Sequence, residues 1–197
     1  MINPLLVLHQ SSLEWSHLVR SRYKLSQIVT YLLIMPLLPS IAWFYGSTQV
    51  GWQSGGSQTV KLAFSSGLLL CIGMYIALLS MNIFVGSMMH WMAKTYGSNL
   101  HAFKGVAFSS FISSPFFLLG VCGFYPMFWL DVALLFAAIV WSVHILYSRM
   151  AAVANISDEQ AFIFSSAVVA VGIVAFISMV VVSVLFMGLV QPPVFID

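Results

Sequence analysis

The stretch that decides the fold covers residues 161–196 and reads AFIFSSAVVAVGIVAFISMVVVSVLFMGLVQPPVFI, without one charged residue. Crossing the hydrocarbon core of a bilayer takes about 20 consecutive apolar residues in a helix. Charged residues make up 6% of the whole chain, whereas a soluble domain carries about a quarter. Together with a mean hydropathy of +1.01, these features indicate an integral membrane protein.

Four further uncharged runs precede this stretch, at residues 25–60, 62–93, 105–130 and 132–148. We predict five transmembrane helices, near residues 26–45, 62–89, 102–122, 126–147 and 158–189. A β-barrel would need alternating segments of about 10 residues, whereas these runs are apolar on every face. The predicted fold class is therefore all-α, a polytopic helical bundle. We divide the chain into an N-terminal segment (1–25), a five-helix transmembrane domain (26–190) and a short extracytoplasmic tail (191–197).

The distribution of Lys and Arg predicts the orientation, because cytoplasmic loops collect positive charge. Five predicted spans place six of the seven Lys and Arg residues on one side of the membrane: Arg20, Arg22, Lys24, Lys94, Lys104 and Arg149. Lys61 is alone on the other side. We therefore expect a cytoplasmic N-terminus and a C-terminus outside.

The first 24 residues predict a short amphipathic helix. Ser11 and Glu14 have the spacing of a capping box, in which each side chain accepts from a free backbone amide of the other. An apolar face around Trp15 and three cationic side chains are typical of a helix that lies on an anionic membrane surface. The interfacial anchors are Trp15, Arg20, Arg22 and Lys24. The alternative is a simple extension of the first span into the cytoplasm.

Several local signals refine the helices. Pro36 and Pro39 predict a kink in the first span, because each removes a backbone hydrogen bond. Gly105, Ser109 and Ser113 recur every four residues, which predicts a seam of small side chains for close helix packing. The last two signals are Pro126, expected in the first turn of the fourth helix, and a capping box formed by Ser157 and Gln160 at the start of the fifth.

Asp131 and His144 are the ionisable residues inside the predicted spans, where such side chains are costly and often functional. Asp131 lies near the outer end of the fourth helix, where it can reach lipid headgroups and the positive end of the helix dipole. His144 lies close enough to the inner boundary to extend its ring toward water. We favour these structural roles, and an ion or proton site at Asp131 is the alternative.

Polar residues of all five predicted helices fall at one depth in the cytoplasmic half: Thr30, Asn82, Ser109, Ser110, His144, Ser165 and Ser166. Hydrogen bonds between neighbouring helices explain such a layer. A polar cavity open to the cytoplasm is the alternative. The candidate polar residues within the membrane are Asn82, Ser109, Asp131 and His144.

The sequence contains no catalytic, cofactor-binding or metal-binding motif. HExxH, GxSxG and Gly-rich phosphate loops are missing. His90 and His101 are eleven positions apart, without the nearby Cys or acidic residue that zinc patterns supply. Cys71 and Cys122 both lie in apolar stretches, and a net charge of +2 is too small to indicate nucleic-acid binding. We predict a protein that is not an enzyme and holds no cofactor or metal.

Several short motifs resemble those of the bacterial branch of the Yip family. They are Gly46-Ser47-Thr48-Gln49-Val50-Gly51-Trp52, Trp91-Met92-Ala93-Lys94-Thr95-Tyr96, Ser114-Pro115-Phe116-Phe117-Leu118, Tyr125-Pro126-x-x-Trp129-Leu130 and Asn155-Ile156. The resemblance covers most of the chain and implies five spans, a cytoplasmic N-terminus and a place in the bacterial inner membrane. Eukaryotic members bind Rab-type GTPases, but bacteria lack that pathway, so Rab binding is not expected here.

Two functions fit these observations. The first is a non-catalytic membrane protein that organises membrane lipid or partner proteins, with further copies of the chain among the candidate partners. The second is a small permease or channel for an ion, a small solute or a lipid. A polar layer that encloses a water-filled cavity would favour the second, and a layer closed by packing would favour the first.

Overall fold

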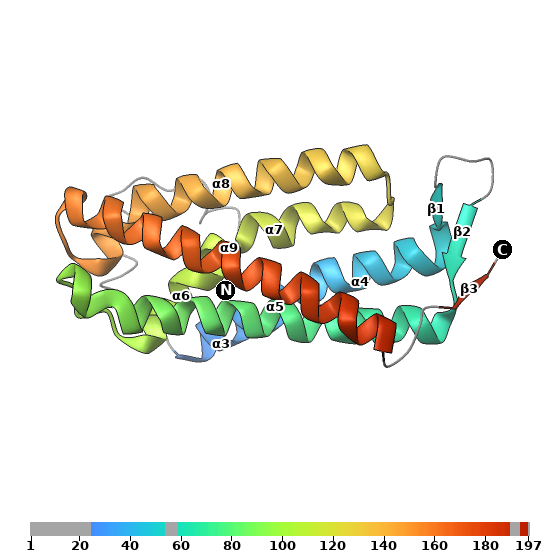
Figure 1. Ribbon diagram of the computed structural model, residues 1–197, viewed down its shortest axis with the longest axis horizontal. Coiled ribbons are helices and arrows are strands. Elements are labelled where there is room, and N and C mark those ends of the chain that lie inside the picture. The colour runs from blue at the N-terminus through green and yellow to red at the C-terminus, as the bar shows by residue number, and fades with distance from the viewer. Residues whose placement is uncertain (1–24, 54–58, 190–193, 197) are drawn as a thin grey trace.

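A computed structural model describes residues 25–53, 59–189 and 194–196 of the chain (Figure 1). Its five long apolar helical segments confirm the predicted spans: Ser26–Val50, Phe64–Tyr96, Ala102–Phe124, Phe128–Ala154 and Asp158–Phe186. The predicted interfacial helix, with Trp15, Arg20, Arg22 and Lys24, lies outside the described residues.

The first span is broken next to Pro36. Helix α3 (Leu25–Ile34) ends before Met35, and α4 (Leu37–Tyr45) begins after Pro36. Neither Pro36 nor Pro39 has an amide hydrogen to continue the helical pattern. The Met35 carbonyl, which would pair with residue 39 in an unbroken helix, accepts from the Leu38 amide at 3.3 Å instead. The Pro36 carbonyl accepts from both the amide and the hydroxyl of Ser40, at 3.4 and 2.8 Å. A π-helical turn, η1 (Gly46–Val50), completes the span.

The third span is also broken at a proline. Helix α6 (Ala102–Ile112) stops at Ser113, and α7 (Ser114–Leu119) has Pro115 in its first turn. A 3-10 turn, η3 (Gly120–Phe124), leads out of the span. The second span, by contrast, is one helix, α5 (Phe64–Ala93), followed by the 3-10 turn η2 (Lys94–Tyr96).

The fourth span differs from its predicted limits at both ends. Helix α8 runs from Phe128 to Ala154, so it extends about two turns beyond the predicted end at residue 147. Arg149 does not stop it, because the helix ends where Asn155 adopts a left-handed conformation (φ 54°). The expectation that Pro126 lies in the first turn is wrong, since the extended residue Met127 caps the helix. Helix α9 (Asp158–Leu189) has the predicted limits.

A small antiparallel sheet adds to the predicted all-α fold. Strand β1 (Trp52–Gln53) pairs with β2 (Thr59–Leu62), which pairs with β3 (Phe195–Ile196). The sheet joins the loop after the first span to the last residues of the chain. We call the end of the bundle with β1–β3 and η3 the sheet end. The opposite end, with residues 94–101 and 155–157, is the hairpin end (Figure 1).

The buried core lies toward the hairpin end. One cluster of buried side chains joins α3, α5, α6, α8 and α9: Tyr31, Met89, Ala93, Leu100, Phe108, Phe111, Leu146, Met150, Val153, Ala154, Ala161, Phe164 and Val168. Close packing of this kind leaves few voids as large as a water molecule. Toward the sheet end α7 lies beside α8 and α5 beside α9, and α4 packs against both α5 and η3 (Figure 1).

Candidate functional site

Contacts between the two loops close the bundle at the hairpin end. The hydroxyl of Ser98 donates to the carbonyl of Ala154 at 2.7 Å, which satisfies one of the free carbonyls at the end of α8. The ring of Tyr96 stacks on Phe164 at 4.9 Å between centroids. Ser98 is buried, and its role is not evident from sequence, because its partner lies 56 residues away.

The predicted polar layer does not form one continuous group. Four of its members, Asn82, Ser109, Ser110 and Ser165, are buried, with 3% exposure or less. The other three, Thr30, His144 and Ser166, are exposed. Side chains this inaccessible have almost no space for water beside them, so the buried members are closed in by packing. This arrangement does not favour a water-filled cavity at that depth.

Three buried polar atoms have no hydrogen-bond partner within the described part of the chain: Asn82 Oδ1, Ser142 Oγ and Ser165 Oγ. The other polar atom of Asn82, Nδ2, donates to the Leu78 carbonyl one turn earlier in α5. Leaving a buried polar group without a partner costs about 1–3 kcal/mol. These atoms come from three different helices, α5, α8 and α9.

The small-residue seam lies at a close crossing of two helices, α5 and α6. A Cβ added to Gly105 would lie 2.4 Å from the carbonyl oxygen of Gly86, and one added to Gly86 would lie 2.4 Å from the Cα of Val106. Backbones therefore touch where α5 crosses α6. Ser109 is buried one turn further along α6, while Ser113 is half-buried at the break before α7. Gly86, the partner of Gly105, was not singled out from the sequence.

A buried hydrogen bond joins the first and third spans, and sequence reasoning also missed it. The hydroxyls of Tyr31 and Ser114 are bonded to each other. Ser114 Oγ also lies 3.3 Å from the Ser110 carbonyl, and the Tyr31 ring packs against Phe111 at 5.2 Å. The available signal was Pro115 next to Ser114, because a proline breaks a helix and exposes backbone groups that polar side chains then satisfy.

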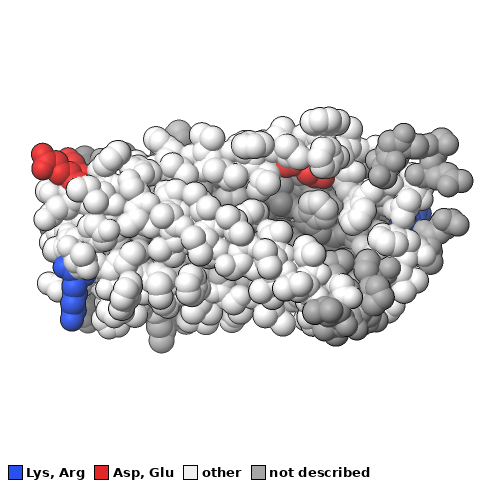
Figure 2. Space-filling view, viewed as in Figure 1, with Lys and Arg blue, Asp and Glu red and all other residues white. Residues whose placement is uncertain are grey.

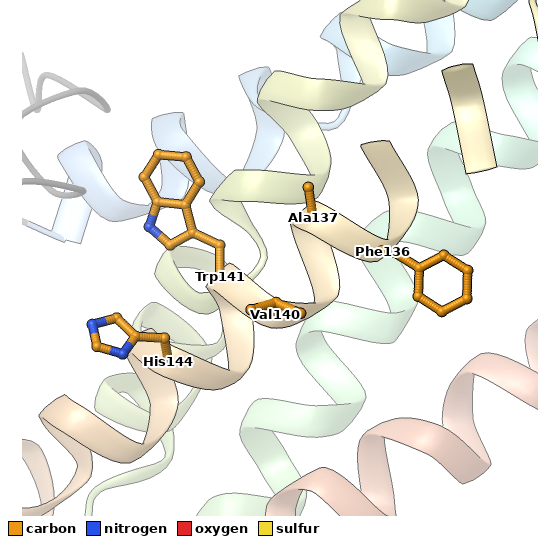
Figure 3. A pocket seen from close by; sticks show the side chains of 5 residues that line it. All are labelled: Phe136, Ala137, Val140, Trp141 and His144. Atoms are coloured by element: carbon orange, nitrogen blue, oxygen red, sulfur yellow. The ribbon is translucent and has the colours of Figure 1, made fainter. Parts of the chain in front are cut away.

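His144 lines a shallow pocket on the outer side of α8, with Phe136, Ala137, Val140 and Trp141 (Figure 3). Figure 3 shows Trp141 and His144 pointing to one side of the helix and Phe136 to the other. The pocket has a volume of about 570 Å³ and an almost entirely apolar lining. It faces away from the stripe of α8 that holds Ala138 and Ser142, both buried. His144 and Asp131 are about 20 Å apart along α8 and do not form one site.

The two histidines at the hairpin end come close together. The rings of His90 and His101 are 6.4 Å apart. His90 Nδ1 bonds to the Leu100 carbonyl at 2.7 Å, while His101 Nδ1 accepts from the Phe103 amide and caps α6. Each ring therefore has one nitrogen engaged in local structure. Within residues 25–53, 59–189 and 194–196, no group of three or more His, Cys, Asp or Glu residues could hold a metal ion.

The described part of the bundle has an opening toward the sheet end, between α8 and α9. Near the hairpin end these helices are in contact, since the Tyr147 hydroxyl lies 2.8 Å from Ser166 Oγ and its ring packs on Phe162. Beyond Val168, however, no residue of α9 with a described side chain is buried. Figure 2 shows the surface hollowed between α8 and α9. We call this opening the lateral hollow.

The inward face of α9 identifies one wall of the lateral hollow. Ala161, Phe164, Ser165 and Val168 form a buried stripe with helical spacing. The same stripe continues through residues that are only half-buried: Val171, Gly172, Ala175 and Met179. A Cβ added to Gly172 would meet nothing within 4 Å. The side of α9 that packs near the hairpin end therefore faces open space toward the sheet end.

Asp131 lies on the corresponding inward stripe of α8. The buried residues Ala138, Ser142 and Ile145 continue with helical spacing to Leu134 and Asp131, which are half-buried. Asp131 is in the first turn of α8. Figure 2 shows acidic atoms over α8 at the edge of the lateral hollow, and Asp131 is the one acidic residue of that helix. The arrangement can place the Asp131 carboxylate at the edge of the lateral hollow, within the membrane-spanning part of the bundle.

Comparisons with known proteins relate the chain to one family of membrane proteins. The family model described as the Yip1 domain matches residues 5–179. The inner membrane protein YohC of Escherichia coli strain K12 is 28% identical over 158 residues, which cover 80% of this chain and 81% of YohC. YohC of Escherichia coli O6:H1 shows the same identity and coverage. No solved structure matches.

Proposed function

The chain belongs to the Yip1 domain family, and on that premise we propose that it is a non-catalytic protein of the bacterial inner membrane that holds membrane lipid between its helices. Its relative YohC is named an inner membrane protein, and five helices of this chain are long and apolar enough to cross a membrane. The observation that carries the proposal is the lateral hollow, an apolar opening directed toward the surrounding bilayer.

The shape of the bundle supports lipid binding over transport. A permease needs a path that reaches both sides of the membrane. Here the hollow narrows toward a tightly packed cluster around Met89, Met150 and Phe164, each with an exposure of 0%. A lipid that enters sideways from the bilayer needs no path through this cluster. The buried members of the polar layer add no second opening at that depth.

The orientation belongs to the same proposal. We infer that the hairpin end, which carries Lys94, Lys104 and Arg149, faces the cytoplasm, because positive charge is retained there. The sheet end, with Lys61, then faces outward, and the lateral hollow opens into the outer leaflet. Single cysteines at Thr59 and Asn99, both exposed, test this in a chain whose Cys71 and Cys122 are replaced by Ala. An impermeant thiol reagent should label position 59 and spare position 99 in intact cells, and the reverse pattern would contradict the orientation.

Lipid binding is tested by filling the hollow. The full chain is purified in mild detergent, and native mass spectrometry counts the phospholipids that remain bound. Gly172→Phe places a ring where the structure leaves open space, so it should reduce the number of retained lipids while the helical content stays unchanged. Gly73→Phe is the matched control, because Gly73 also has nothing within 4 Å but lies exposed on α5. Equal retention by the wild type and both variants would refute the proposal.

A further inference from the structure

We propose that the lateral hollow selects a phospholipid whose headgroup carries a primary ammonium, and that Asp131 accepts hydrogen bonds from that ammonium. This inference rests on the proposed function and adds the chemical class of the ligand. It depends on the position of Asp131 and the depth of the hollow.

Asp131 is the polar group at the mouth of the hollow. It lies on the inward stripe of α8, two turns before the buried residue Ala138. The first turn of a helix favours a negative charge because of the helix dipole. Asp131 forms no ion pair within the described residues. An ionised carboxylate in such a place gains from a cationic partner that the membrane can supply.

The depth of the hollow fits one lipid leaflet. One leaflet contributes about 15 Å of hydrocarbon, half of the thickness of the bilayer core. The distance along α8 from Asp131 to Ser142, a buried residue of the inward stripe, is about 16 Å. An acyl chain beside α8 therefore reaches the closed end of the hollow while its headgroup stays level with Asp131. This match favours a membrane phospholipid over a water-soluble solute.

Headgroup chemistry provides the selectivity. A primary ammonium donates three hydrogen bonds, and a bond between charged groups is stronger than one between neutral groups. A trimethylated ammonium carries the same charge but has no N–H to donate. A glycerol headgroup has hydroxyls but leaves the phosphate charge uncompensated beside the carboxylate. We therefore expect phosphatidylethanolamine to bind best, followed by phosphatidylcholine and then phosphatidylglycerol.

The test uses the purified full chain, stripped of lipid by detergent exchange and mixed with equal amounts of phospholipids that share the same acyl chains. The lipids are phosphatidylethanolamine, its N-methyl and N,N-dimethyl derivatives, phosphatidylcholine and phosphatidylglycerol. Native mass spectrometry measures the occupancy of each. The wild type should retain phosphatidylethanolamine about tenfold over phosphatidylcholine, with occupancy falling at each methylation. Asp131→Asn should reduce this preference to less than twofold.

Controls separate binding from folding. Asp158→Asn removes an exposed carboxylate from the first turn of α9, at the opposite end of the bundle, and should keep the tenfold preference. Circular dichroism should show the same helical content for both variants. The inference is overturned if the wild type does not discriminate among the headgroups, or if Asp131→Asn keeps the full preference.

The outcome also separates this inference from the proposed function. If lipids are retained and Gly172→Phe displaces them without any headgroup preference, the hollow binds lipid and Asp131 does not select it. If the wild type retains no lipid, both proposals fail. If the mass spectra instead show a lipid-free dimer that Gly172→Phe dissociates, a second copy of the chain occupies the hollow and the lipid ligand is refuted.

Discussion

Two buried serines of the chain differ in what their hydroxyls contact. Ser98 Oγ donates to the Ala154 carbonyl at 2.7 Å and links the loop after α5 to the end of α8. Ser165 Oγ, with its side chain 0% exposed, has no hydrogen-bond partner among the described residues. The net value of a hydrogen bond is about 1 kcal/mol, whereas an unpaired buried group reduces stability. The same substitution should therefore act in opposite directions at the two positions.

We predict that Ser98→Ala lowers the melting temperature in detergent, with a loss of about 1–2 kcal/mol, because the Ala154 carbonyl is left unpaired. Ser165→Ala should leave the melting temperature unchanged or raise it, since Ala has a similar volume and no polar atom. Thermal unfolding followed by intrinsic fluorescence measures both variants. A Ser165→Ala variant that is less stable than Ser98→Ala would contradict this account.

At the residue scale, sequence predicts what is local in the chain. The capping box of Ser157 and Gln160 is confirmed. The backbone amide of Gln160 donates to Ser157 Oγ, and the backbone amide of Ser157 donates to Gln160 Oε1, both at 3.4 Å. That motif can be predicted locally, because it depends only on two residue types three positions apart. The bonds of Ser98 to Ala154 and of Tyr31 to Ser114 join distant parts of the chain. No local pattern indicates which of the many serines find such partners.

At the scale of elements, α5 and α6 cross with their backbones in direct contact. Gly86 and Gly105 allow the two backbones to touch, and close approach gains dispersion energy that lipid contacts do not replace. The regular spacing of small residues on α6 made Gly105 visible in the sequence. Its partner was not visible, because α5 is apolar on every face and its three glycines and two alanines show no periodicity that marks the crossing.

Gly86→Ala tests the crossing. The new methyl group would lie 2.4 Å from the Cα of Val106, and backbone atoms cannot move aside as a side chain can. We expect a loss of about 1–3 kcal/mol, the range typical of overpacking. Gly73→Ala in the same helix meets nothing within 4 Å and should be neutral or stabilising by up to about 1 kcal/mol. Chemical denaturation in mixed micelles compares the two, and equal stabilities would argue against a tight crossing.

The prolines were used to predict where single helices bend and begin, and the structure agrees in one case and differs in another. A kink was expected around Pro36 and Pro39, and the structure separates α3 from α4 at Met35 and Pro36. The start of α8 was misplaced, because a proline fits the first turn of a helix but does not require it. The residue that follows Pro126, Met127, is extended and caps the helix instead. Charge at Arg149 suggested an early end for α8, but the left-handed Asn155 determines it.

At the scale of the whole molecule, the bundle is closed at the hairpin end and open toward the sheet end. Five spans follow from length and hydropathy, which is why the sequence predicts them. The lateral hollow does not follow from these properties. Inward-facing and lipid-facing residues of α9 are equally apolar, so no periodic pattern distinguishes a side that packs from a side that faces lipid. The position of Asp131 on the inward stripe likewise becomes evident only once α8 is placed against its neighbours.

The central claim, that the inward side of α9 is packed near the hairpin end and borders the lateral hollow toward the sheet end, is tested by a nitroxide scan in lipid nanodiscs. Spin labels are attached one at a time at positions 171–182, and the accessibility of each to dissolved oxygen is measured by electron paramagnetic resonance. A helix that packs on one face gives a period of 3.6 residues. This account predicts that labels at Gly172, Ala175 and Met179 are accessible to oxygen, with only the shallow dip that half-burial on the inward side gives. Accessibility close to zero at those three positions would show that another protein surface covers the inward side of α9 and would contradict the lateral hollow.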